Sequence, residues 1–331
     1  MRRRVLPFLA VVALIVVAAC GGDDEPTTGS VRSVTLVLDW TPNTNHGGIF
    51  LAAANGWYDD AGIDLEIVQP GETGGLQAVA AGAAEFAISV QESIVPAQAQ
   101  GVPVVSVAAI VQHNTSSLLA LASSGIEDPA DLPGRRYGGF GGQLEQALIK
   151  RLVECAGGDP SGVEVVEVGN TDYRLGMERG DFDVVWIFDG WDKLRLEQAG
   201  VEVTTIPFIE HTDCIPDWYT PLIATSSALA EDDPELVAAF LEATARGYQA
   251  AIDDPTAAAD ALLAAAPELD ERLVYASAEY LADQFQADAE QWGVQSERVW
   301  SEFVEFLLTA GLIESSPSMA DAYTNKFLPD S

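Results

Sequence analysis

The stretch Val34-Thr35-Leu36-Val37-Leu38-Asp39-Trp40-Thr41-Pro42-Asn43-Thr44-Asn45-His46-Gly47-Gly48 decides the fold class of this chain. Its first five residues are apolar or β-branched, as is typical of a buried strand, and the Thr, Pro, Asn and Gly residues that follow indicate a loop. Beyond the loop we expect a helix from about residue 48 to residue 55. Residues 63–68 alternate between apolar and acidic, which predicts a second strand. A strand, a helix and another strand in this order begin an α/β fold.

The same alternation continues along the chain. Apolar runs predict further strands at residues 87–90, 104–111, 118–122, 135–138, 163–168 and 184–188, and helices are expected at 74–81 and 143–155. Residues 221–225 read as an extended crossing, and from residue 234 the chain changes to long Ala-rich amphipathic helices. Strands that alternate with helices predict a parallel or mixed sheet covered on both faces.

The order of these elements predicts two α/β lobes. About 300 residues follow the N-terminal segment, a size at which chains commonly split into two domains. A second run of strands begins near residue 117, and the C-terminal helices return to the first unit. We expect lobe one at residues 31–113 and 224–331, lobe two at residues 114–223, and two hinge crossings between them.

The N-terminal segment has the pattern of a secretory signal. Residues 1–19 combine three arginines, an apolar run too short to span a bilayer and small residues before Cys20, which predicts a signal peptide. Val17-Ala18-Ala19-Cys20 resembles a bacterial lipobox, which implies lipidation of Cys20 and anchoring to the cell membrane outside the cytoplasm. The polar residues 20–30 predict a flexible tether. The alternative is an ordinary signal peptide cut near Ala19.

The charge of the chain argues against some classes of partner. It has 16 Lys and Arg against 51 Asp and Glu, and removal of the three N-terminal arginines changes the net charge from −35 to −38. Such acidity opposes binding to nucleic acid or to anionic lipid. Cys155 and Cys214, which remain besides Cys20, allow one disulfide; their spacing does not decide whether they pair, and it does not resemble a metal site. We expect no metal and no cofactor.

Three loops after expected strands carry the candidate binding residues, since ligands of open α/β sheets bind at the carboxyl ends of strands. The first loop contains Trp40, Asn43, Asn45 and His46. An aromatic ring next to two amides and an imidazole suits a flat heterocycle. The alternative is a loop in which Thr44 or Asn45 caps the next helix and Trp40 packs into the core.

The second loop is the glycine-rich bend at residues 138–142, which contains Phe140 and leads to Glu145. Glycines before a helix let a ligand approach backbone N–H groups at the positive end of the helix dipole. Leu144 stands where a dinucleotide-binding fingerprint would need glycine, so the bend is not that motif. A plain tight turn is the alternative.

The third loop follows a buried strand and contains Asp189, Trp191 and Asp192. Its carboxylates are suited to accept hydrogen bonds from amino groups of a ligand whose ring stacks on an aromatic side chain. Trp186 and Phe188 are expected in the strand core. Two acids on one loop do not make the flanking pair of a glycosidase, and no catalytic residue is assigned.

Four segments together resemble the solute-binding proteins of ABC importers for pyrimidine precursors of thiamine. They are Leu38-Asp39-Trp40-Thr41-Pro42-Asn43-Thr44-Asn45-His46-Gly47, Asn55-Gly56-Trp57-Tyr58-Asp59-Asp60-Ala61-Gly62-Ile63-Asp64-Leu65, Asp131-Leu132-Pro133-Gly134 and residues 186–192. The second segment is shared with nitrate, sulfonate and taurine binders, so it supports the fold more than the ligand. The resemblance implies a periplasmic-binding-protein-like fold of type II.

The resemblance also implies a function. The protein would close over an aminopyrimidine with a hydroxymethyl or formylaminomethyl substituent and deliver it to an ABC permease with its ATPase. The implied ligand residues are Trp40, Asn43, Asn45, His46, Phe140, Glu145, Asp189, Trp191 and Asp192. Riboflavin is the alternative ligand.

A fungal enzyme that makes the thiamine pyrimidine belongs to the same family and is the alternative of a different class. That enzyme carries clustered cysteines in the segment corresponding to residues 214–219, whereas this chain has Cys214 alone there. A lone thiol lacks the soft ligand set that an iron site would need. We therefore expect a binding protein rather than an enzyme.

Overall fold

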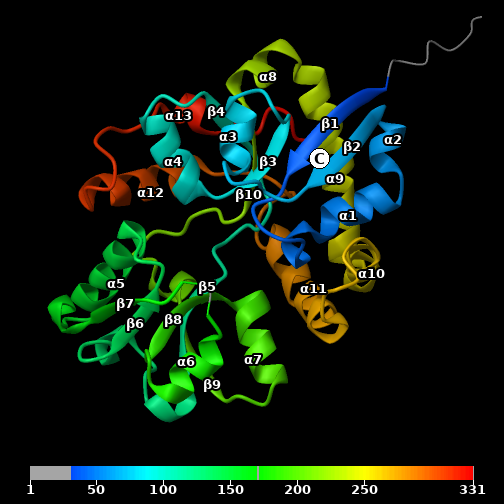
Figure 1. Cartoon of the computed structure of the whole chain (residues 1–331). Coiled ribbons are helices and arrows are strands. Elements are labelled where there is room, and N and C mark those ends of the chain that lie inside the picture. The colour runs from blue at the N-terminus through cyan, green and yellow to red at the C-terminus, as the bar shows by residue number, and fades with distance from the viewer. Residues whose placement is uncertain (1–30, 170, 331) are drawn as a thin grey trace, which may run out of the picture. The chain divides into compact units, whose positions relative to one another are not determined.

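The computed structural model describes residues 31–169 and 171–330. The expected signal peptide, tether and lipidated Cys20 lie outside these residues. The described part contains two five-stranded sheets, each accompanied by helices (Figure 1). None of its helices is long and apolar enough to cross a membrane.

The first sheet has the strand order β2-β1-β3-β10-β4. Its strands are β1 (Arg32–Val37), β2 (Ile63–Val68), β3 (Phe86–Ser89), β4 (Val104–Ala109) and β10 (Leu222–Ser226). β1 is parallel to β2 and β3, whereas β10 runs antiparallel between β3 and β4. The sequence predicted an extended crossing at residues 221–225, and the structure instead makes this segment an inner strand. The local sequence pattern could not predict this strand's place in the sheet, because its partners β3 and β4 lie far away in the sequence.

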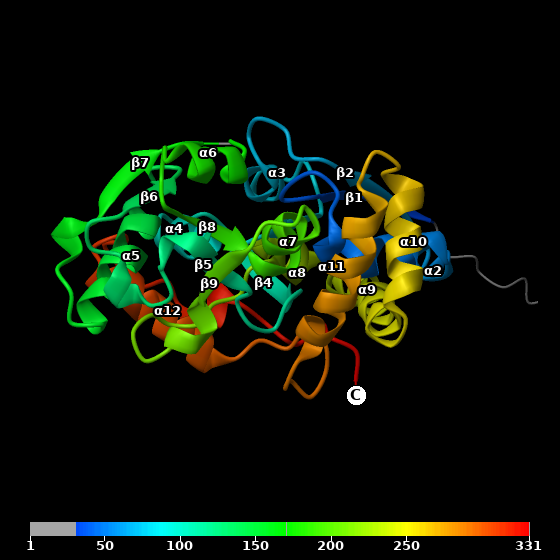
Figure 2. The ribbon, with the colours of Figure 1, turned by 90° about the horizontal axis from the view of Figure 1, so that it is seen from below.

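The helices that accompany the first sheet come from both ends of the described chain (Figures 1 and 2). They are α1 (Gly47–Ala54), α2 (Trp57–Asp60), α3 (Gly75–Ala80), α4 (Gln91–Ala99), α8 (Ser227–Asp232), α9 (Pro234–Asp253), α10 (Pro255–Ala265), α11 (Glu271–Gln286), α12 (Glu297–Thr309) and α13 (Met319–Ala322). The short turn η1 (Thr44–His46) precedes α1. The long helices α9, α11 and α12 each bury an apolar face, as the periodicity of the sequence predicts.

Close packing of α1 on α9 fixes the loop that follows β1. Gly48 and Gly247 meet at the contact, and a Cβ at Gly247 would collide with the carbonyl oxygen of Gly48. From the next residue of α9, the Tyr248 hydroxyl donates a hydrogen bond of 2.7 Å to the Asn45 carbonyl oxygen. The absence of side chains at the two glycines therefore lets α9 hold the loop directly.

The second sheet has the strand order β7-β6-β8-β5-β9. Its strands are β5 (Ser116–Leu121), β6 (Arg136–Gly139), β7 (Glu164–Glu167), β8 (Val184–Phe188) and β9 (Val203–Pro207), and its helices are α5 (Gln143–Cys155), α6 (Tyr173–Arg179) and α7 (Leu194–Gln198). Short turns lie between them: η2 (Ala122–Ser124), η3 (Pro129–Asp131), η4 (Pro160–Gly162), η5 (Asp189–Lys193) and η6 (Phe208–His211). β6 is parallel to β7 and β8, and β5 is antiparallel to β8 and β9.

Two mixed sheets covered by helices confirm the expected fold class. The expected helix at 143–155 and the strands at 63–68 and 184–188 have the predicted bounds. Sequence analysis missed β9, α4 and α6. The first sheet takes its strands from residues 32–109 and 222–226 and the second from residues 116–207. The lobe boundaries drawn from the sequence stay a proposal. β10 begins at Leu222, whereas the second part of lobe one was expected to begin at residue 224.

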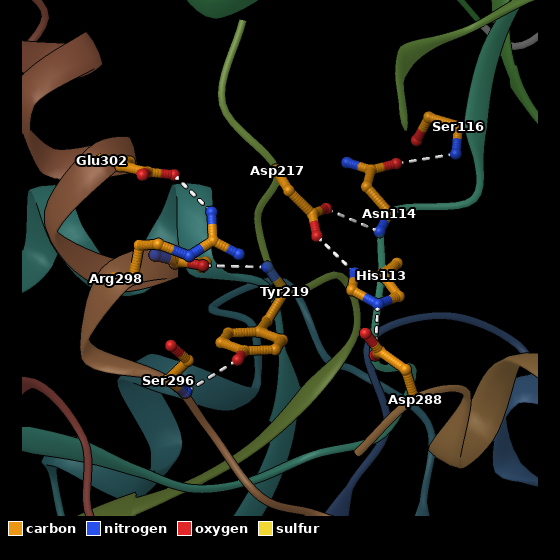
Figure 3. Close-up of polar contacts among 10 residues, drawn as sticks. His113, Asn114, Ser116, Asp217, Tyr219, Asp288, Ser296, Arg298 and Glu302 are labelled. Atoms are coloured by element: carbon orange, nitrogen blue, oxygen red, sulfur yellow. Dashed lines mark hydrogen bonds and ion pairs between the residues drawn. The ribbon is translucent and has the colours of Figure 1, made fainter. Parts of the chain in front are cut away.

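Two crossings, residues 110–115 and 212–221, connect the sheets, and charged groups tie them together (Figure 3). The Asn114 backbone N–H donates to one oxygen of Asp217 at 2.9 Å, and His113 Nδ1 lies 2.7 Å from the other. The second ring nitrogen of His113 lies 2.8 Å from Asp288, which follows α11. The hydrogen bond to Asp217 raises the pKa of His113 to about 9, partial burial opposes the rise, and Asp288 adds to it. His113 is therefore an imidazolium at neutral pH and joins the first crossing to Asp217 of the second crossing and to Asp288 after α11.

A disulfide joins Cys155 at the end of α5 to Cys214 in the second crossing. The sequence left this pairing open. A cross-link between residues this far apart typically stabilises a folded chain by about 2–4 kcal/mol. It also fastens the second crossing to the helix that follows the glycine-rich bend.

We expect His113→Gln to lower the free energy of unfolding by about 1–3 kcal/mol at pH 6 and by little at pH 10. The pKa of His113 is raised by folding, so its contribution is complete below the unfolded value near 6.5 and is lost as pH rises through about 9. Urea unfolding across this pH range checks the result. His211→Gln is the control, because His211 forms no ion pair within the described residues. A loss in the free energy of unfolding of His113→Gln that is the same at every pH would contradict the role of the His113 ion pair.

Candidate functional site

Unpaired polar atoms gather where the two sheets and the two crossings meet. Nine buried side-chain polar atoms of the described residues have no hydrogen-bond partner among them. Six belong to a group that we call the junction site: Gln91, Gln112, Asn114, Ser116, Trp186 and Asp189. Folded proteins pair nearly all of their buried polar atoms, and an excess in one place indicates a site for a polar ligand or for water. The junction site is therefore the candidate binding site.

The first-sheet side of the junction site is held by backbone contacts. α4 begins at Gln91, whose side-chain oxygen accepts a hydrogen bond of 2.8 Å from the Tyr219 backbone N–H. In the first crossing, the Asn114 side-chain oxygen accepts one of 2.7 Å from the Ser116 N–H (Figure 3). Both amides have their oxygen engaged and their NH₂ group unpaired. They therefore offer donors to a ligand.

The second-sheet side offers an indole and a carboxylate at the end of β8. Trp186 meets Trp218 edge to face, with ring centroids 6.0 Å apart, and its Nε1–H is unpaired. Asp189 accepts a hydrogen bond of 2.9 Å from the Ser117 hydroxyl through one oxygen, and its other oxygen is unpaired. Burial raises the pKa of Asp189, and the Ser117 hydrogen bond opposes the rise. Phe188, expected in the core, is 37% exposed; it is the last residue of β8.

The loop after β1 does not present all of its predicted residues to a ligand. His46 is fully buried; its Nδ1 accepts a bond of 3.3 Å from the Asn43 N–H, so the Nε2–H donates to Asp39 at 2.8 Å. Both ring nitrogens are engaged within the protein, which favours a supporting role for His46 in the proposed site. The Asn43 side chain caps η1 through the Asn45 N–H, so the cap is Asn43 rather than Thr44 or Asn45, which the alternative named. Trp40 is 57% exposed and is not a core residue.

The glycine-rich bend engages its acid internally. Glu145 accepts hydrogen bonds from the backbone N–H groups of Phe140, at 3.0 Å, and Gly142, at 3.1 Å. This geometry caps the N-terminus of α5, which makes the bend a capping turn and leaves Glu145 little capacity for a ligand. The sequence could not reveal this, since a carboxylate three residues into a helix suits either role. Phe140 is 55% exposed.

The loop after β8 reaches the first sheet's helices. Trp191 packs against the apolar cluster of those helices. The Ser277 hydroxyl of α11 donates to the Gly190 carbonyl oxygen and lies 2.5 Å from the Thr44 hydroxyl. Ser277 thus joins the loop after β1 to the loop after β8, two of the three loops singled out from the sequence. Asp192 pairs with Arg195 at 3.0 Å, and burial raises its pKa although Arg195 opposes the rise.

Glu92 was missed by sequence analysis. It lies in the first turn of α4, directly after Gln91, and its Oε2 accepts a hydrogen bond of 3.0 Å from the Trp218 Nε1–H. Burial raises its pKa to about 7, its own backbone N–H and Trp218 lower it, and the charge of Asp39 raises it. The sequence could have indicated Glu92, because it follows the expected strand at residues 87–90 and ligands of open α/β sheets bind at the carboxyl ends of strands.

Two open hollows lie elsewhere on the described surface. One, of about 600 Å³, is lined by Trp57 and Arg246 among others, and one of about 1210 Å³ lies between α5 and α12. Neither is lined by any residue predicted to bind a ligand. Neither hollow is lined by a residue of the junction site, so the unpaired polar atoms alone carry the assignment.

Comparison with known proteins gives a family. The family model described as NMT1/THI5 like matches residues 43–258. A formylaminopyrimidine-binding protein of Halalkalibacterium halodurans is 27% identical over 323 residues, covering 95% of this chain and 96% of that protein. A 4-amino-5-hydroxymethyl-2-methylpyrimidine phosphate synthase of Legionella pneumophila is 28% identical over 300 residues, covering 90% and 92%. These matches confirm the resemblance seen in the sequence.

A solved structure supports the fold. The periplasmic aliphatic sulphonate binding protein SsuA from Escherichia coli matches with a TM-score of 0.69 at 16% identity, covering 87% of this chain and 91% of that one. At this identity the match concerns the fold alone. The expected periplasmic-binding-protein-like fold of type II is confirmed.

We expect Asp189→Asn to leave the protein as stable as the wild type at pH 7, or more stable by up to about 1 kcal/mol. The pKa of Asp189 is raised by burial, so its charged form is penalised in the folded state above the unfolded pKa near 3.9. Thermal unfolding at pH 7 and pH 4 checks this, and the advantage should vanish at pH 4.

Asp183→Asn is the matched control and should destabilise. Burial alone would raise the pKa of Asp183, but hydrogen bonds from the Arg136 backbone and guanidinium outweigh it and lower the pKa. Loss of the charge should therefore cost about 0.5–1.5 kcal/mol at pH 7. A loss in the free energy of unfolding in Asp189→Asn as large as in Asp183→Asn would contradict the assignment of Asp189 as a buried acid with one unpaired oxygen.

Proposed function

Because the chain belongs to the NMT1/THI5-like family, we propose that it is the solute-binding protein of an ABC importer and captures an aminopyrimidine precursor of thiamine. The proposal covers an aminopyrimidine with a hydroxymethyl or a formylaminomethyl substituent. The formylaminopyrimidine-binding relative, which aligns over nearly the whole chain, supports this ligand class. Riboflavin is the competing ligand to be tested against it.

The grouping of unpaired donors and acceptors at the junction site is the observation that carries the proposal. A small aminopyrimidine has ring nitrogens that accept and an amino group that donates, all in one plane. The unpaired NH₂ groups of Gln91 and Asn114 and the Trp186 Nε1–H are donors, and the unpaired Asp189 oxygen is an acceptor. Polar groups of both kinds beside an indole suit such a ring.

We propose these roles for the residues predicted from the sequence. Asp189 accepts from the ligand's amino group, and Trp40 and Trp191 supply aromatic surface from opposite sheets. Asp192 remains a second acceptor, although Arg195 now shares its charge. The further proposed contacts are Asn45 and Phe140. His46 acts indirectly, by holding Asp39.

A synthase is the competing class, since several relatives are named for that activity. Against it, Cys214 is bonded to Cys155, so it offers no thiolate to a metal. His46 is buried with both ring nitrogens engaged, which argues against proton transfer to a substrate. We therefore propose binding without turnover.

We further propose that the protein works outside the cytoplasm, anchored through a lipid on Cys20 and partnered by a permease and an ATPase. A structural disulfide fits an oxidising compartment. The lipobox-like residues 17–20 support the anchor. The acidity of the chain argues that the membrane contact is made by lipid rather than by a charged protein surface.

We expect the full chain in mild detergent to bind hydroxymethyl- or formylaminomethyl-aminopyrimidine with a Kd of about 1 μM or tighter, and to bind riboflavin at least about tenfold more weakly. Calorimetry measures both. Asp189→Ala should weaken binding by about ten- to a hundredfold, because a buried hydrogen bond to a charged acceptor is lost. Asp159→Ala, at an exposed cap far from the junction site, is the control. Tight riboflavin binding without pyrimidine binding, or formation of a pyrimidine product from added pyridoxal phosphate, histidine and iron, would refute the proposal.

We expect Cys20→Ser to release the protein from the cell membrane or to leave the precursor unprocessed, because serine cannot form the thioether to the lipid. Cell fractionation and mass spectrometry of the mature N-terminus measure this. Cys155→Ser is the matched control and should remain membrane-bound. A wild-type N-terminus other than Cys20, without lipid, would refute the anchor and leave the binding proposal in place.

A further inference from the structure

Resting on the proposed function, we infer that Glu92 recognises the amino edge of the pyrimidine as a neutral carboxylic acid, donating to a ring nitrogen and accepting from the adjacent amino group. This assigns the ligand's specificity to a residue of α4 that lies next to the junction site and was not singled out in the sequence. It extends the proposed site, in which Asp189 supplied the only unpaired acidic acceptor.

The position of Glu92 permits this contact. It follows Gln91 at the start of α4, so it lies at the carboxyl end of β3. The Trp218 Nε1–H donates to Oε2 at 3.0 Å and fixes the carboxyl group. Trp218 is the one side chain that donates to this carboxyl group within the described residues, and the Glu92 residue is partly exposed. The carboxyl group thus keeps acceptor capacity for a ligand.

The surroundings connect Glu92 to the junction site. Trp218, which holds its carboxyl group, packs edge to face with Trp186, whose Nε1–H is unpaired. Gln91, the preceding residue, has an unpaired NH₂ group. Glu92 is thus linked to Trp186 through Trp218, and the neighbouring Gln91 carries a second unpaired donor.

The charges around Glu92 favour its neutral form. Its pKa is raised to about 7, first by burial, with Asp39 adding to the rise. Asp39 at the end of β1 is held by His46. Asp217, in the second crossing, is paired with His113. The acid of α13, Asp321, contacts α4 at Gln98, at the opposite end of the helix from Glu92.

A neutral carboxyl group matches the pyrimidine edge better than a carboxylate does. A carboxylate has acceptors only and would face the lone pair of a ring nitrogen with a second lone pair. A carboxylic acid offers one donor and one acceptor side by side, which pair with the ring nitrogen and the amino group. Binding then needs the Glu92 proton, so affinity should fall as pH rises through the range in which that proton is lost.

Glutamine at this position mimics the neutral acid, because its amide offers the same donor and acceptor at every pH. We therefore expect the wild-type Kd, measured by calorimetry on the full chain in mild detergent, to rise by about tenfold per pH unit above about pH 8. Glu92→Gln should bind at pH 6 within about threefold of the wild type and keep that affinity to pH 9. Glu92→Leu should bind about ten- to a hundredfold more weakly at pH 6. Glu72→Gln, in an exposed loop, is the control and should keep the wild-type profile.

A second ligand makes the test independent of any folding defect in Glu92→Leu. The hydroxymethylpyrimidine without its amino group should bind the wild type about tenfold or more weakly than the amino compound, and this discrimination should shrink in Glu92→Leu but persist in Glu72→Gln. Wild-type binding with an unchanged pH profile and unchanged discrimination in both Glu92 variants would overturn the inference alone. No aminopyrimidine binding by the wild type at any pH would overturn the proposed function and this inference with it.

Discussion

The insertion of β10 between β3 and β4 is the constraint on which the rest of the structure depends. Leu222 pairs with Ser89 on one side and with Ala109 on the other, so the chain must leave the first sheet after β4 and return to its interior. The two crossings therefore run side by side, and Asp217 of one binds the backbone of the other. This geometry brings the ends of β3, β4 and β8 together and makes the junction site.

Burial disfavours the charged form of acids at and beside the junction site. It raises the pKa of Asp189 within the site and the pKa values of Glu92 and Asp192 outside it. The neighbouring residues His46 and Glu145 instead have hydrogen-bond partners. His46 bonds to Asp39, and Glu145 accepts from the backbone of the glycine-rich bend. Buried acids with a disfavoured charge, confined to one region and surrounded by paired polar groups, are typical of a functional site.

Much of the fold could be predicted because periodicity is a local property. The strands at 63–68 and 184–188 and the helix at 143–155 follow from the pattern of apolar residues. The role of β10 could not be predicted, since its partners are far away in sequence. Sequence analysis identified loops of the candidate site but not the role of each side chain in them. Asp189 and Trp191 lie where loops from both sheets meet, whereas Glu145 caps a helix and His46 is buried.

The sequence by itself determined the α/β class, the family resemblance and the loops that carry polar and aromatic residues, because each of these is encoded in short stretches. Only the tertiary structure decided which atoms of those residues remain unpaired. The Gln91 oxygen accepts from the Tyr219 backbone and the Glu145 oxygens accept from the bend, while one oxygen of Asp189 is left without a partner. Pairing depends on distances between segments far apart in the chain, and packing fixes those distances.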